Sequence, residues 1–154
     1  MTGPAARLAA LGLTLPPVTA PVAAYVPAVR TGGYVYVSGQ VPIVDGKLAA
    51  AGKVGGEVSA SEAAGLARTC ALNALAAAAA AAGGLDQIRR IVKVTGFVAS
   101  APGFSGQPQV VNGASELLIE VFGEDGRHAR SAVGVAELPL NAPVEVELIA
   151  EIRG

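Results

Sequence analysis

Two stretches near the carboxyl end decide the fold that the sequence predicts: residues 130–139 read RSAVGVAELP, and residues 143–152 read PVEVELIAEI. Side-chain character alternates in both with the period of two that is typical of β-strands. The second stretch has one apolar face and one face that carries glutamates. In the first, Arg130 is the only charge on a face of small residues, where its guanidinium fork is suited to a carboxylate. The competing interpretation is an ordinary solvated strand whose charges bind nothing.

Upstream of these strands, strand-like and helical segments alternate. Extended or strand segments are predicted at residues 25–29, 34–38 and 91–99, and helices at residues 4–11, 59–82 and 109–122. A Thr-Gly-Gly turn at residues 31–33 joins the first two strands in a hairpin. Ser59 or Ser61 is predicted to cap the alanine-rich helix, and Gly83-Gly84 to end it. In the strand at residues 91–99, we expect Val92, Val94 and Gly96 to share one face.

Without the short first helix, the element order is β-β-α-β-α-β-β, an α+β arrangement with two helices on one face of one sheet. The length fits a single domain over residues 1–154, with residues 1–20 as an amino-terminal extension. Residues 49–58 are small and glycine-rich and are expected to form a loop. Two helices leave the other sheet face uncovered, and a face of that kind should be buried. The simplest cover is another copy of the chain.

Composition excludes several classes of function. The net charge is -1, there is no tryptophan, and tyrosine and phenylalanine number three each, which argues against a nucleic-acid partner. Cys70 is the single cysteine, so no intrachain disulfide forms, and we expect it in the core. His128 is the single histidine, which excludes a histidine-based zinc site or triad. Its polar neighbours predict an exposed loop residue.

Two apolar runs could be mistaken for membrane or export signals. Residues 8–13 are too short for a signal peptide and are followed by Pro16-Pro17. Residues 74–82 are alanine, leucine and little else, without the ~20 strongly apolar residues that a membrane span needs. The sequence therefore predicts no membrane partner and a cytoplasmic protein, which the single cysteine also fits.

The motifs in this order resemble the RidA/YjgF family, whose older label is endoribonuclease L-PSP. The resemblance runs from about Tyr25 to the carboxyl end and rests on Tyr25, YVYVSGQVP at 34–42, IVKVTGFV at 91–98, Val111-Asn112, and the 130–139 stretch with Glu145 and Glu147. It implies a chorismate-mutase-like fold with one mixed sheet, and a homotrimer with clefts between subunits. It also implies hydrolysis of small enamine or imine intermediates of the 2-aminoacrylate type to 2-keto acids and ammonia, with no metal and no cofactor.

The resemblance also assigns roles to individual positions. The position of Arg130 holds the substrate carboxylate, and that of Glu145 holds or activates the attacking water. The positions of Tyr25, Ser38, Gly39 and Asn112 line the cleft. Ala132 stands where many active members have cysteine, which changes the shape of the pocket. An alternative function is therefore a non-catalytic trimer that binds small carboxylates; RNA cleavage fits the composition poorly, and chorismate mutase activity rests on fold analogy alone.

The implied fold places Arg130 and Glu145 near the starts of two antiparallel strands that are separated by a third. We expect them at opposite ends of the sheet, more than about 15 Å apart in one chain. That distance is too long for one small imine. The sequence thus predicts a site that takes Arg130 from one subunit and Glu145 from its neighbour.

Overall fold

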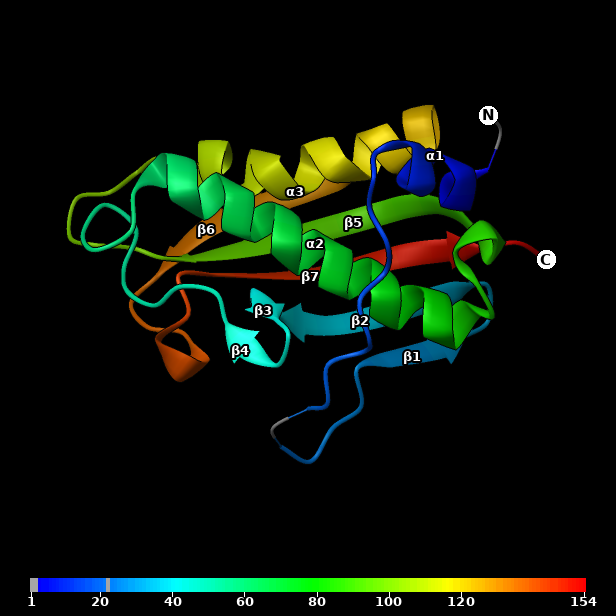
Figure 1. Cartoon of the computed structure of the whole chain (residues 1–154), viewed down its shortest axis with the longest axis horizontal. Coiled ribbons are helices and arrows are strands. Elements are labelled where there is room, and N and C mark those ends of the chain that lie inside the picture. Colours follow the sequence, from blue (N-terminus) through cyan, green and yellow to red (C-terminus); the bar gives the residue numbers. More distant parts are fainter. Residues whose placement is uncertain (1–2, 22) are drawn as a thin grey trace.

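The structure, a computed structural model, describes residues 3–21 and 23–154, and its centre is a five-stranded sheet in the order β1-β2-β7-β5-β6 (Figure 1). The strands are β1 (Ala28–Thr31), β2 (Tyr34–Gln40), β5 (Ile88–Ala99), β6 (Ala129–Val135) and β7 (Val144–Ile152). β6 pairs with β5 in parallel, and the other neighbours are antiparallel. A small hairpin, β3 (Ile43–Val44) and β4 (Lys47–Leu48), surrounds the Asp45-Gly46 turn. The predicted α+β fold with one mixed sheet is confirmed.

Two long helices cover one face of the sheet, and a short one packs against the end of one of them (Figure 1). They are α2 (Ala60–Ala82), α3 (Gln107–Phe122) and α1 (Pro4–Ala10); short 3₁₀ turns are η1 (Leu85–Gln87), η2 (Gly123–Gly126) and η3 (Pro139–Asn141). Of the two predicted caps, Ser59 is the one used, because its side chain accepts a hydrogen bond from the Glu62 N–H. Gly83 ends α2 at φ 92°, in the left-handed region that favours glycine.

The alanines of α2 allow it to lie very close to its neighbours. A Cβ on Gly113 of α3 would collide with the backbone oxygen of Ala64, so only glycine permits this helix crossing. α2 is also the one helix among residues 3–21 and 23–154 that is long and apolar enough to cross a membrane by length and composition. Within the fold 61% of its apolar window is buried, and it packs on β2 and β7. It is therefore a core helix of this fold.

The central strand β5 departs from the prediction. It begins at Ile88 rather than Ile91, and its pairing with β7 shifts between Ile88 and Arg90 and again between Ile91 and Lys93. These bulges interrupt the simple alternation. As a result Ile88, Ile91 and Val94 are buried beneath the helices, and the expectation that Val92 shares a face with Val94 is wrong.

The glycine-rich segment at residues 49–58 is a loop, as predicted, but it is built into the core. Val54 and Val58 are buried, and Val54 bonds through its N–H to the Ala99 carbonyl at the end of β5. Cys70 is also buried, as expected for a small core residue, and burial raises the pKa of its thiol well above the ordinary value.

The second face of the sheet is open, as the element order predicts. Val29, Tyr34, Tyr36 and Val133 are exposed there, each at least 42% accessible. Exposed apolar and aromatic side chains that gather on one face are a common feature of interaction surfaces.

The amino-terminal segment is part of the fold. α1 packs against α3, Leu8 is buried, and Leu13 and Leu15 lie against the core. From there the chain crosses α2 toward the lower edge of the sheet (Figure 1). We refer to residues 13–21 as the arm.

Candidate functional site

The structure divides the seven predicted site residues into two groups. Tyr25, Gly39 and Glu145 line one pocket, with Ser38 beside it. Arg130, Asn112 and Ala132 lie together at the other edge of the sheet, where β6 meets α3. We refer to these as the glutamate pocket and the arginine cluster.

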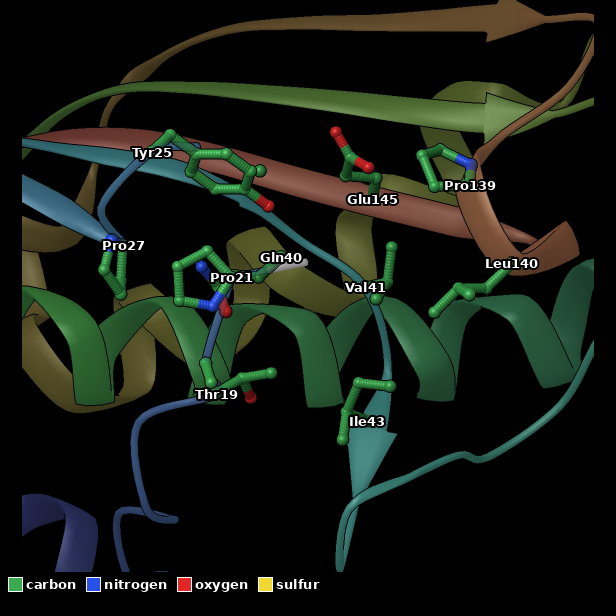
Figure 2. Close-up of a pocket in the computed structure, with 12 residues that line it drawn as sticks. Thr19, Pro21, Tyr25, Pro27, Gln40, Val41, Ile43, Pro139, Leu140 and Glu145 are labelled. Carbon is green, nitrogen blue, oxygen red and sulfur yellow. The ribbon is translucent and has the colours of Figure 1, made fainter. Parts of the chain in front are cut away.

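The glutamate pocket has a volume of about 100 Å³. It lies where the pairing of β2 with β7 is irregular, beneath the arm and beside η3. Its lining residues are Thr19, Ala20, Pro21, Tyr25, Pro27, Gly39, Gln40, Val41, Ile43, Pro139, Leu140 and Glu145. Figure 2 shows the Tyr25 ring and the Glu145 carboxylate side by side in it, with Thr19 and Pro21 of the arm on a different wall from Leu140. The walls are thus largely apolar around a single ionisable carboxylate.

A break in strand pairing gives Glu145 its place. The pairing of β2 with β7 shifts between Val37 and Gln40, and Gly39 lies in this irregular part. A Cβ on Gly39 would collide with the Glu145 carboxylate, so glycine is needed for the close approach. Burial raises the pKa of Glu145, and the neighbouring Glu147 carboxylate raises it further. A carboxyl group tuned in this direction is suited to general acid–base work near neutral pH.

Ser38 supports the pocket from outside its lining. Its hydroxyl donates to the Val26 carbonyl over 2.8 Å, and its N–H donates to the Pro27 carbonyl over 2.8 Å. These bonds tie β2 to the segment that carries Tyr25. Ser38 thus lies next to the pocket, bonded to the segment that follows Tyr25, and its predicted place in the cleft stays a prediction.

In the arginine cluster, α3 holds the Arg130 guanidinium from one side. Nη1 donates to Asn112 Oδ1 over 2.7 Å and to Ser115 Oγ over 3.3 Å, and Nη2 donates to the Pro108 carbonyl over 3.4 Å. Within the part of the chain that the structure describes, these bonds use three of the five N–H donors, which leaves two for a ligand. Ala132, two residues along β6, faces the same side and packs against the core.

His128 is not the exposed loop residue that the sequence suggested. It is half-buried, with Nδ1 2.6 Å from the Gly126 carbonyl and Nε2 2.9 Å from Ser115 Oγ. Burial lowers its pKa, and the Arg130 charge acts in the same direction, against the bond to Gly126. In the neutral ring Nδ1–H must donate to the carbonyl, so Nε2 accepts from the Ser115 hydroxyl. Ser115 Oγ is then oriented to accept from Arg130.

The two groups lie on opposite faces of the sheet. Arg130 pairs with Val94, which pairs with Leu148, and these apolar partners are buried beneath the helices. Glu145 is three residues from Leu148, so it faces the other way. The expectation that the two charges lie at opposite ends of the sheet is wrong, because Arg130 is level with the middle of β7. The backbone positions are still roughly 14 Å apart, at ~3.3 Å per residue and ~4.8 Å per strand.

Three parts of the site were not found from the sequence. They are the arm residues Thr19 to Pro21, the η3 residue Leu140, and the Ser115–His128 pair behind Arg130. One sequence feature could have pointed to Leu140, because this residue directly follows the Leu-Pro motif. In the structure its φ of 62° is rare for a branched side chain. The arm residues and the Ser115–His128 pair are brought to the site by tertiary packing, which a local sequence pattern does not predict.

Comparison with known proteins identifies the family. Residues 5–152 match the family model described as "YjgF/chorismate_mutase-like, putative endoribonuclease". Protein TCP17 of Trypanosoma cruzi is 46% identical over 150 residues, which cover 97% of this chain and 94% of that protein. The crystal structure of Atu1372, a protein of unknown function from Agrobacterium tumefaciens, is 50% identical with a TM-score of 0.90, covering 97% of this chain and 92% of that one.

A more distant structure contains a small ligand. E. coli TdcF with bound serine is 27% identical with a TM-score of 0.61, covering 91% of this chain and 94% of that one. The family model spans nearly the whole sequence, and these relatives cover most of the chain. The chain therefore belongs to the YjgF/chorismate mutase-like family, which is the RidA/YjgF family that its motifs resemble.

Proposed function

We propose that this protein hydrolyses small enamine or imine acids to 2-keto acids and ammonia, in clefts between the subunits of a homotrimer. The observation that carries the proposal is the Glu145 carboxylate, held against Gly39 in a largely apolar pocket. Burial raises its pKa toward the range of a working acid–base group. The serine bound to TdcF supports a small amino-acid-like ligand for this fold.

The chemistry needs few groups, because an imine carbon is already electrophilic. Arg130 holds the carboxylate of the substrate through its two remaining N–H donors. Glu145 accepts a proton from water as the water oxygen bonds to the imine carbon and the C=N π electrons move to nitrogen. The protonated Glu145 returns that proton to the nitrogen, which gives a carbinolamine. Glu145 then takes the hydroxyl proton as the C=O bond forms and passes it to the nitrogen as the C–N bond breaks, so that ammonia leaves with the keto acid.

The homotrimer is part of the proposal. In one chain Arg130 and Glu145 face opposite sides of the sheet, so a single subunit cannot apply both to one small molecule. The exposed Val29, Tyr34 and Tyr36 provide an apolar surface for a neighbouring copy. Closed three-fold symmetry gives three equivalent clefts, each with an arginine cluster and a glutamate pocket from different subunits. A cytoplasmic location without nucleic-acid or membrane partners completes the proposal.

Ala132 favours one alternative, a trimer that binds small carboxylates without catalysis. The arginine cluster serves both functions, whereas Glu145 is required only for hydrolysis. The two functions therefore differ in what a change at Glu145 does.

Replacing Glu145 with glutamine is expected to reduce imine hydrolysis by about 100-fold or more, the usual contribution of acid–base catalysis, while keto-acid binding persists. The measurement is ammonia release from imines generated freshly from several amino acids. In the wild type the rate should fall on the acid side with a midpoint above the ordinary pKa of glutamate, because protonated Glu145 cannot take a proton from water.

Two variants on the same face of β7 serve as controls. Glu147→Gln removes the like charge that raises the pKa of Glu145, so the acid limb should move to lower pH. Glu151, which pairs with Arg89, is remote from the pocket, and Glu151→Gln should leave the profile unchanged. Full activity in Glu145→Gln would refute hydrolysis by this carboxylate and leave the binding function.

A further inference from the structure

We propose that the apolar part of the glutamate pocket, closed by the arm, binds the side chain of the substrate. The protein then prefers imino and keto acids with branched hydrocarbon side chains of a few carbons over those of the pyruvate and 2-aminoacrylate size. This inference rests on the proposed function, because it places the reacting carbon between Glu145 and the arginine cluster of a neighbouring subunit.

The geometry of the reacting carbon leads to the pocket. An imine carbon is planar and has three substituents: the nitrogen, the carboxylate and the side chain. Arg130 of a neighbouring subunit takes the carboxylate, and the water and nitrogen lie at Glu145. The third substituent must then point into the chain that supplies Glu145, where Ala20, Pro21 and Ile43 form the walls.

The size and polarity of the pocket define the side chain that fits. A volume of about 100 Å³ is well above the ~10–15 Å³ that one water requires. A methyl group would leave most of this space to water against apolar walls, whereas a branched four-carbon chain would displace that water. Among the described lining residues, Glu145 supplies the only charge, so charged side chains are disfavoured.

The walls are held in place by contacts that are independent of any ligand. The arm is anchored upstream, where the Ala5 N–H donates to Asp86 Oδ1 over 3.0 Å and where Leu13 and Leu15 lie against the core. On another wall, Leu140 has φ 62° and ψ 14°. That conformation is costly for leucine, and the bond from the Gly52 N–H to the Asn141 carbonyl, 2.9 Å, helps to hold it. The strained backbone at Leu140 thus keeps the Leu140 side chain at the wall of the pocket.

Two variants change the pocket in opposite directions. Ala20→Phe fills it from the exposed arm. Leu140→Gly widens it, and the fold should persist because glycine adopts a φ of 62° without strain. Ala9→Phe, at an exposed position of α1 outside the pocket, is the matched control.

Calorimetry with 4-methyl-2-oxopentanoate and pyruvate tests the proposal. The wild type and Ala9→Phe should bind 4-methyl-2-oxopentanoate at least about tenfold more tightly than pyruvate. This is a modest expectation for several added carbons in an apolar pocket. In Ala20→Phe and Leu140→Gly the ratio of the two affinities, branched acid to pyruvate, should fall toward one. The affinity for pyruvate itself should stay within about threefold of the wild type.

The possible failures separate the two proposals. Equal binding of both acids by the wild type, or an unchanged ratio in both pocket variants, would overturn the side-chain pocket and leave carboxylate binding intact. Absence of binding by either acid would overturn the pocket and the assigned role of Arg130 together. A branched-acid preference in a protein that releases no ammonia would instead support the pocket and refute hydrolysis.

Discussion

Arg130→Ala is expected to abolish the binding of small carboxylates such as 2-oxobutyrate or benzoate, while the fold persists. The guanidinium lies between β6 and α3 with donors left for a ligand, so its removal takes away both anion-binding bonds at once. Hydrogen bonds to charged groups are worth about 1.5–3 kcal/mol each, and the loss of two corresponds to roughly 100-fold or more in affinity. Calorimetry measures the affinity, and circular dichroism follows the fold.

The shape of the guanidinium is tested separately from its charge. Arg130→Lys keeps the positive charge but loses the fork that bonds Asn112 and a carboxylate together, so it should also fail to bind. Arg127→Ala is the control, because that arginine has a side chain 66% exposed and paired with Glu124. It should bind like the wild type. Undiminished affinity in Arg130→Lys would contradict the assigned role.

In the arginine cluster, the sequence was enough to predict some features but not others. The alternation of the last two strands was enough to predict that Arg130 and Ala132 share one face and that Glu145 lies on the face away from Val144. It could not predict that His128 is half-buried, because its partner Ser115 lies on α3 and the polar run at residues 123–128 looks solvated by itself. Burial of a histidine depends on what the fold brings to it, and that information is not local.

The ends of the helices and strands and the walls of the pocket also divide into features that local sequence predicts and features that depend on tertiary packing. The Ser59 cap and the Gly83 stop follow from backbone chemistry within a few residues, and both were predictable. The earlier start of β5 was not, because bulges near Arg90 and Val92 shift a register that simple alternation assumes to be constant. The arm was identified as an extension, but its contact with the glutamate pocket depends on how it crosses α2, which its proline-rich sequence does not encode locally.

Mixing inactive Arg130→Ala subunits with inactive Glu145→Gln subunits is expected to restore hydrolysis. In one chain the two charges face opposite sides of the sheet, so each working cleft must combine a glutamate pocket from one subunit with an arginine cluster from the next. In a randomly exchanged equal mixture, about one quarter of the clefts of a three-fold ring contain both intact residues. Ammonia release should therefore recover to about one quarter of the wild-type rate.

The control mixture contains Arg130→Ala subunits and subunits that carry both changes. No cleft in it can hold an intact pair, so it should stay inactive, and recovery there would indicate contamination rather than complementation. Sedimentation and native mass spectrometry report whether mixed trimers form. A stable monomer at micromolar concentration would remove the basis of the shared cleft. Confirmed mixed trimers without activity would show that Arg130 and Glu145 do not act together, because the opposed faces of the sheet leave no way for them to meet in one chain.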